Sequence, residues 1–119
     1  MSTTPLPDAL AGLAALEDPK ARAVNERHGD AHGVNLTRLR GVAKQIGADP
    51  ALADELWDSG DVAGQLLGIL VAKPRALSAD RLDAMVRSTL SAKAHDWLVA
   101  YLVKKSPDAE ELRTRWSED

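Results

Sequence analysis

The sequence contains no cysteine and no phenylalanine, and aromatic side chains make up only 3% of its 119 residues. Without cysteine the chain has no disulfide, no thiolate nucleophile and no cysteine-ligated zinc site. Leu, Val and Ala must therefore form most of the core. Positive charge is not in excess, because 15 basic residues face 18 acidic ones and the formal charge is −3. Nucleic-acid binding would then depend on a local basic patch.

A long apolar segment is also lacking. The most apolar stretch, residues 62–72, is shorter than the roughly 20 residues that cross a bilayer. Residues 1–5 show no basic segment followed by an apolar run, which is the pattern of a secretory signal. We therefore expect a cytoplasmic protein with no membrane partner.

Residues 62–72 are the element around which we expect the chain to pack. Gln65 is the only polar side chain in this stretch, and at helical spacing its apolar residues fall on several faces. A buried strand is the alternative, but the helical segments on both sides favour a helix. Gly64 and Gly68 are four residues apart, where a missing side chain allows a neighbouring helix to come close.

Helix start signals recur along the sequence, whereas the Val/Ile/Thr alternation of strands is absent. Asp18 and Asp49 each precede a proline, which combines an N-cap with a favoured first helical residue. Asn35 and Ser78 are further predicted caps. The helix after Asn35 carries one apolar stripe, formed by Leu36, Leu39, Val42, Ala43 and Ile46.

These signals predict an all-α fold of about seven short helices. We expect residues 1–4 to be a flexible tail and residues 5–119 to form a single HEAT-like helical domain. The predicted architecture is an α–α superhelix of about three antiparallel helix pairs. An irregular orthogonal bundle is the alternative.

Trp97 and Tyr101 are the aromatic residues with the clearest functional interpretation. They are four residues apart, so both rings project from one helix face, next to the acidic Asp96. Such a pair could contact a base or a sugar, although the spacing also fits two core residues. Trp57, in contrast, lies on an apolar stripe and is predicted to be core.

Five basic residues are candidates for contacting DNA phosphates. The alternative is a solvated surface balanced by acidic neighbours such as Glu26, Asp49 and Asp54. The candidates flank one apolar stripe or end a helix, and they are Arg38, Arg40, Lys44, Lys104 and Lys105.

Histidine patterns predict neither a metal site nor a catalytic dyad, and no cofactor is indicated. His28 and His32 have a spacing that suits a metal on a helix, but the glycines beside them indicate a turn, and no third ligand is near. His95 and Asp96 are adjacent, and adjacent helical residues do not face each other.

Four segments together resemble the DNA alkylation-repair proteins of the HEAT-like repeat type, the AlkD-like glycosylase family. The set includes a Gly33–Val34 turn followed by Leu39–Arg40, and then Leu-Trp-x-Ser-Gly at 56–60. The resemblance covers nearly the whole chain and corresponds to the N-terminal half of a family member. The segments are residues 22–29, 33–40, 53–60 and 96–99.

The resemblance implies a concave, positively lined superhelix that holds duplex DNA. Enzymes of this family excise positively charged alkylated purines such as 3-methyladenine and 7-methylguanine. Aromatic side chains and a carboxylate stabilise the oxocarbenium-like sugar, because an anion near a developing cation stabilises the transition state most.

Carried over by position, the active-site tryptophan of the family matches Trp97. The catalytic aspartate is expected four residues later, where this chain has Tyr101, whose phenol is neutral at pH 7. Asp96 is about a quarter-turn away from Trp97. Ala63 and Gln65 also stand where family members usually have an acidic and then a basic residue. We therefore expect a retained scaffold with incomplete catalytic equipment, and Trp97, Asp96 and Tyr101 are the catalytic candidates.

A noncatalytic protein–protein interaction module is the alternative function. A shortened superhelix leaves its last helix pair with an uncapped apolar face. Leu112 and Trp116 would form this face, through which we predict a homo-oligomer or a second chain.

Overall fold

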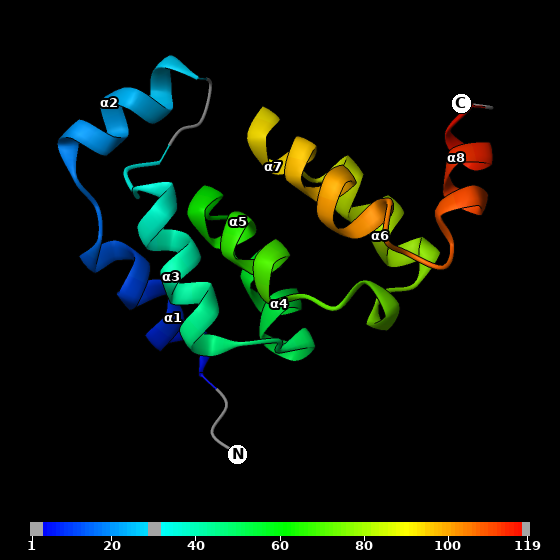
Figure 1. Ribbon diagram of the computed structural model, residues 1–119, viewed down its shortest axis with the longest axis horizontal. Coiled ribbons are helices and arrows are strands. Elements are labelled where there is room, and N and C mark those ends of the chain that lie inside the picture. The colour runs from blue at the N-terminus through cyan, green and yellow to red at the C-terminus, as the bar shows by residue number, and fades with distance from the viewer. Residues whose placement is uncertain (1–3, 29–31, 118–119) are drawn as a thin grey trace.

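The computed structural model describes residues 4–28 and 32–117, and helices form nearly all of the regular structure there (Figure 1). In this part of the chain no strand occurs, and one isolated bridge joins Glu17 to Val34. The all-α prediction is confirmed. The elements are α1 (Leu6–Ala15), α2 (Pro19–Arg27), α3 (Leu36–Ile46), α4 (Pro50–Asp58), α5 (Val62–Val71), the 3₁₀ turn η1 (Pro74–Ala76), α6 (Ala79–Arg87), α7 (Ala92–Trp97), the π-helix η2 (Leu98–Val103) and α8 (Ala109–Ser117).

Helix α5 is the centre of the structure, as the sequence predicts. Every residue from Ala63 to Ile69 is buried, and the helix packs against α1, α3, α4, α7 and η2. Its first turn is capped by Asp61, whose carboxylate accepts a hydrogen bond from the Gly64 amide at 2.9 Å. Burial of an apolar helix on several sides is the main favourable contribution to folding here.

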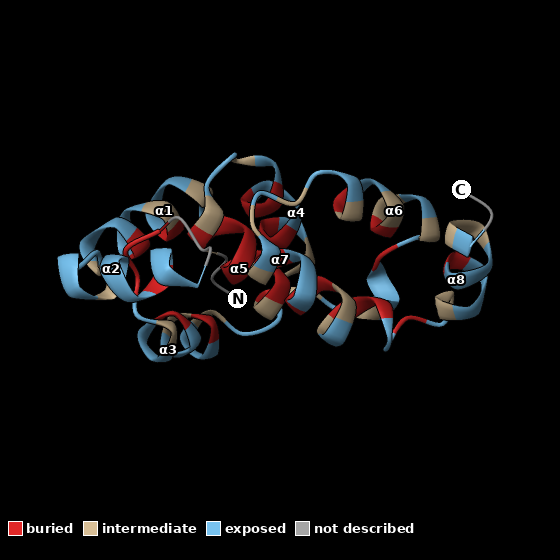
Figure 2. Ribbon diagram, turned by 90° about the horizontal axis from the view of Figure 1, so that it is seen from above, coloured by how far each residue is buried: buried red, intermediate tan, exposed pale blue. Residues whose placement is uncertain are grey.

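The helices lie in two layers around α5. Seen from above, α1, α4 and α6 lie along one side, and α3 and α7 lie along the other (Figure 2). Helix α4 packs on α5, and α6 packs on η2, which continues α7. This arrangement of helix pairs is the predicted HEAT-like superhelix, in which each pair buries its apolar faces against the next.

The predicted helix starts are confirmed by side-chain caps. The carboxylates of Asp18 and Asp49 accept from the amides of Lys20 and Leu52. The Asn35 side chain accepts from two amides of the first turn of α3, and the Ser78 hydroxyl accepts in the first turn of α6. Each such cap satisfies backbone donors that the helix itself leaves unpaired.

The helix predicted to carry Trp97 and Tyr101 is present, but it is not a regular α-helix throughout. It begins at Ala92, where the Ser91 hydroxyl caps it. Its second half is π-helical, and the Lys104 amide donates to the Val99 carbonyl at 3.0 Å across five residues. Sequence periodicity does not predict this widened turn, because π-helices are rare and have no simple residue pattern.

Gly68 allows the close helix approach that was predicted, but Gly64 does not. A Cβ atom on Gly68 would lie 3.1 Å from the Ala53 carbonyl oxygen in α4. A Cβ on Gly64 would instead meet the Ser59 hydroxyl at 3.0 Å, in the turn between α4 and α5. Only one of the two glycines therefore faces a neighbouring helix.

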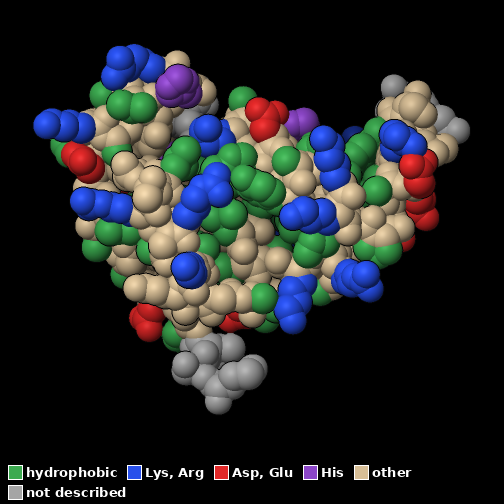
Figure 3. Space-filling view, viewed as in Figure 1, with side chains coloured by type: hydrophobic (Ala, Val, Ile, Leu, Met, Phe, Trp, Pro, Cys, Tyr) green, Lys and Arg blue, Asp and Glu red, His purple; other side chains and the backbone are tan. Residues whose placement is uncertain are grey.

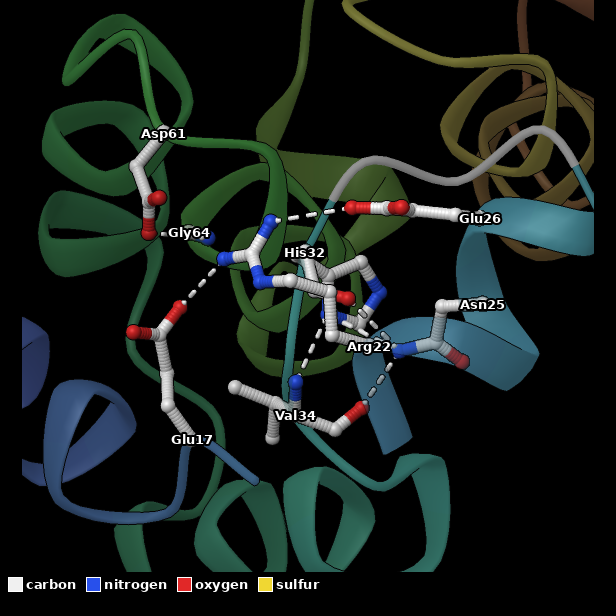
Figure 4. A network of polar contacts seen from close by, with 8 residues as sticks. All are labelled: Glu17, Arg22, Asn25, Glu26, His32, Val34, Asp61 and Gly64. Atoms are coloured by element: carbon white, nitrogen blue, oxygen red, sulfur yellow. Dashed lines mark hydrogen bonds and ion pairs between the residues drawn. The ribbon is translucent and has the colours of Figure 1, made fainter. Parts of the chain in front are cut away.

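A buried polar network ties α2 to the start of α3 (Figure 4). The Asn25 amide donates to the carbonyls of His32 and Val34, at 3.0 Å each. His32 Nδ1 accepts from the Val34 amide at 3.1 Å, and its side chain is 2% exposed. These bonds satisfy backbone groups that would otherwise be buried without partners, so His32 has a structural role.

Two predictions fall partly outside the described residues. The predicted turn around His28 and His32 includes residues 29–31, and the predicted tail at 1–4 includes residues 1–3; neither group is among the described residues.

Arginines on the outer helices connect them through ion pairs. Arg81 of α6 contacts both Asp54 and Asp58 of α4, at 3.1 and 3.2 Å. Arg115 of α8 contacts Asp80 of α6 at 3.1 Å. Exposed pairs of this kind contribute little energy individually, but they show where much of the acidic charge of these helices is engaged.

Leu112 of α8 is 0% exposed, because it packs into the core of this chain. The prediction that it helps to form an exposed apolar face is therefore wrong. Trp116 is partly buried, and its Nε1 donates to Asp83 of α6 at 2.8 Å.

Among the described helices, none is long and apolar enough to cross a membrane.

We expect the contact between α6 and α8 to weaken in acid. The hydrogen bond from Trp116, together with that from Arg87, lowers the pKa of Asp83. A carboxylate with a lowered pKa stabilises the folded state above its unfolded pKa, and this contribution is lost as the pH falls through the folded pKa. Carboxyl NMR titration should show Asp83 titrating below ordinary aspartates, and Trp116→Phe should raise its pKa. An unchanged Asp83 pKa in this variant would contradict the role of the Trp116 bond.

Candidate nucleic-acid interface

Helix α3 presents three of the predicted DNA-contacting cations to solvent. Its apolar stripe faces inward, with Leu39 and Ala43 buried. Arg38, Arg40 and Lys44 lie outside this stripe, and all three are exposed. The cations therefore flank the apolar stripe, with Arg38 on one side of it and Arg40 and Lys44 on the other.

Lys104 and Lys105 follow the end of η2 and are also exposed. Cations at a helix C-terminus are favoured by the negative end of the helix dipole. We refer to these two residues together with Arg38, Arg40 and Lys44 as the basic surface. Within the described residues, none of the five forms an ion pair with a carboxylate.

The acidic residues that could have balanced the basic surface are engaged elsewhere. Glu26 pairs with Arg22 at 3.5 Å, and Asp54 pairs with Arg81. Asp49 caps α4 by accepting from the Leu52 amide. The alternative of a charge-balanced surface therefore receives no support from these three residues.

Figure 3 shows the face on which α3 and α7 lie in front. Lys and Arg side chains are spread across this face, and Asp and Glu side chains lie mostly toward its edges. Like charges left unpaired on one face raise the local concentration of anionic partners. A chain with a net negative charge thus still has a face that suits an anionic polymer.

Arg40 also joins α3 to the α7–η2 helix through Trp97 and Tyr101. Its Cζ lies 4.7 Å from the centroid of the Trp97 ring, a cation–π contact. Its Nη2 donates to the Tyr101 hydroxyl at 3.3 Å. The two rings meet edge-on with centroids 5.7 Å apart. We refer to these three residues as the Arg40 cluster.

Trp97 is 9% exposed and belongs to the core cluster, whereas Tyr101 is partly buried. The sequence allowed two interpretations of Trp97 and Tyr101, as rings that share one helix face and as core residues. Both describe the structure, because the rings meet and also pack on the core. With Arg40 over its ring, Trp97 has little surface left for stacking a base. The arrangement therefore suits an anion contacted by Arg40 better than a base stacked on Trp97.

Asp96, the third catalytic candidate, forms no hydrogen bond or ion pair with the three residues of this cluster. Its side chain is 83% exposed, and its nearest ionic partner is His95, with 3.9 Å between Oδ1 and Nδ1. Adjacent helical residues do approach each other here, contrary to expectation, but both lie in solvent. An exposed carboxylate is well solvated and stabilises a developing cation weakly. The structure thus brings Trp97 and Tyr101 together but not Asp96.

A cavity of about 260 Å³ lies beside Tyr101, between the end of α5 and η2. Leu70, Ala72 and Pro74 give it apolar walls, and Lys105 also lines it. The cavity places Lys105 next to the ring whose hydroxyl holds Arg40. Cations from two parts of the basic surface therefore lie near Tyr101.

Two roles were missed by sequence reasoning. Arg40 was identified as a phosphate contact but not as the partner of Trp97 and Tyr101, which lie about 60 residues away. Gln65 is the second, since neither its polarity in an apolar helix nor its place in the family pattern predicts its partners. Its side chain donates to the Ser88 carbonyl and accepts from the Leu90 amide, at 3.0 and 2.9 Å. A lone polar residue in an apolar run was the available signal, because buried amides need partners.

Two layers of packed helix pairs define a HEAT-like repeat protein. The chain matches the family of DNA alkylation repair enzymes over residues 9–119, and it belongs to that family. It is also similar in fold to a solved structure described as a new family of proteins related to the HEAT-like repeat DNA glycosylases with affinity for branched DNA structures. That match has a TM-score of 0.84 and 22% identity, and it covers 98% of this chain but 52% of the other. The chain thus spans about half the length of the solved protein. A search of curated proteins finds no match.

Proposed function

We propose that this member of the DNA alkylation repair family binds duplex DNA through the basic surface and lacks glycosylase activity by itself. The observation that carries the proposal is the set of five exposed cations that form no ion pair among the described residues. Phosphates are the natural counter-charge for such a set, and they bind without reading sequence. The affinity for branched DNA described for the similar solved protein is consistent with this class of ligand.

In the part of the chain that the structure describes, none of the three catalytic candidates supplies a carboxylate beside the Trp97 ring. Excision of a cationic alkylated purine needs an anion near the sugar as positive charge develops. Tyr101 stands where the family resemblance implies the catalytic aspartate, and its side chain is a phenol whose hydroxyl accepts a hydrogen bond from Arg40. Asp96 is exposed and directed into solvent.

We therefore expect no release of 7-methylguanine from duplex DNA above the spontaneous rate. The measurement is chromatography of the freed base after incubation with excess protein. Asp96→Asn is the informative variant, because Asp96 is exposed and its replacement should leave the fold intact. Base release by the native chain that disappears in Asp96→Asn would overturn the noncatalytic proposal.

The second candidate function is a protein-binding module. A cavity of about 450 Å³ lies between η2 and α8, with Val99, Val103 and Trp116 among its lining residues. Lys104, Glu110 and Arg113 also line it, and apolar walls with a charged rim suit an amphipathic helix of a partner. Duplex binding that is absent at low salt would favour this candidate over the first. The predicted homo-oligomer and a cytoplasmic location stay predictions.

A further inference from the structure

We infer that the Arg40 cluster is a pre-positioned site for one DNA phosphodiester, in which Trp97 and Tyr101 act as positioning residues for the Arg40 guanidinium. The inference rests on the proposed DNA binding and identifies the group that holds the phosphate between α3 and the α7–η2 helix. Trp97 and Tyr101 then act in DNA binding and take no part in the excision of a base.

The Arg40 guanidinium has a geometry that matches a phosphate. A guanidinium has five N–H donors in one plane and binds a phosphate through two parallel hydrogen bonds. Arg40 uses one nitrogen to donate to Tyr101, and its Cζ lies over the Trp97 ring. Among the described residues, it forms no ion pair with a carboxylate. Donor groups that the cluster does not use remain available to an anion.

The surroundings then fix the side chain before the anion arrives. A free arginine loses considerable rotamer freedom when it binds. Here the Trp97 ring is anchored in the core and Tyr101 is partly buried, so their contacts hold Arg40 in one orientation. Pre-positioning lowers the entropy lost on binding. Arg40 should therefore contribute more to DNA affinity than a cation of the same charge without partners.

Arg38 provides that comparison. It lies on the same helix and is exposed, and within the described residues its guanidinium has no hydrogen bond or ion pair. Lysine keeps the charge of either arginine but has neither the planar fork nor the stacking surface. The pair of substitutions Arg40→Lys and Arg38→Lys thus separates pre-positioning from charge.

The experiment measures duplex affinity by fluorescence anisotropy over a range of salt concentrations for the native chain and each variant. Arg40→Lys should weaken binding about tenfold, the loss of roughly one charge-assisted hydrogen bond, without changing the salt dependence. Arg38→Lys, which also alters the basic surface, should weaken binding clearly less than Arg40→Lys, since the Arg38 guanidinium has no such bond to lose. Arg40→Gln should also reduce the slope of log affinity against log salt by about 1.

Tyr101→Phe tests positioning directly. Removing the hydroxyl should weaken binding in the native background and have no further effect in Arg40→Lys, a coupling that a purely structural role would not produce. Urea unfolding should confirm that the variants fold. Equal effects of Arg40→Lys and Arg38→Lys, with native binding intact, would overturn the inference and leave the proposed function standing. Displacement of DNA by inorganic phosphate at matched ionic strength would overturn the assignment to the DNA backbone, and a native chain that binds no duplex would overturn both proposals.

Discussion

Replacing Gly68 by valine should lower the free energy of unfolding by about 2 kcal/mol, because the side chain has no room between α5 and α4. The Cβ alone would lie 3.1 Å from the Ala53 carbonyl oxygen and 3.3 Å from Leu56 Cβ. Valine adds two methyl groups beyond that atom. Both neighbours belong to the packed interface with α4, so relief requires the two helices to separate.

Gly12→Val is the matched control. Gly12 lies in α1, and a Cβ there would meet no atom within 4 Å. The same substitution should change stability by less than about 0.5 kcal/mol, since valine and glycine differ little in helix propensity. Urea unfolding followed by circular dichroism measures both variants. Equal midpoints for the two would contradict the close packing of α4 on α5.

The fold could be predicted from the sequence because its signals are local. The apolar run at 62–72 and the caps at Asp18, Asn35, Asp49 and Ser78 each specify nearby backbone structure. The structure contains a buried α5 and helices that begin at these caps. Agreement among such local signals is what directs a chain to one fold.

The candidate site was less predictable because it depends on contacts between distant helices. The spacing of Trp97 and Tyr101 predicts that their rings share a face, and the rings do meet. No local pattern indicates that Arg40 would lie over them or that Leu112 would be fully covered. Those facts follow from how α3 packs beside the α7–η2 helix and how α8 folds back onto α6, which tertiary packing decides.

Neutralising three cations of the basic surface should weaken duplex binding strongly. The triple variant Arg38→Gln, Lys44→Gln and Lys104→Gln removes charges that have no carboxylate partner in the described structure and leaves the Arg40 cluster intact. Each lost phosphate contact should reduce the salt slope by about 0.9. The expected result is a slope smaller by nearly 3 and an affinity at low salt reduced by at least about tenfold.

A second triple variant controls for net charge. Arg22, Arg113 and Arg115 form ion pairs with acidic neighbours on α2, α6 and α8 or in the turn between α1 and α2. Replacing them by glutamine changes the total charge by the same amount. Their effect on duplex affinity should be much smaller, because a paired cation has less charge to offer a phosphate. Equal losses in both triple variants would indicate attraction by net charge instead of a defined surface.

The most direct test of the account is the affinity of the native chain for undamaged duplex DNA at several salt concentrations. We predict binding at low salt that weakens steeply as salt rises, with a slope that reflects several phosphate contacts. Binding that is absent at low salt, or that does not change with salt, would contradict the assignment of the basic surface to DNA.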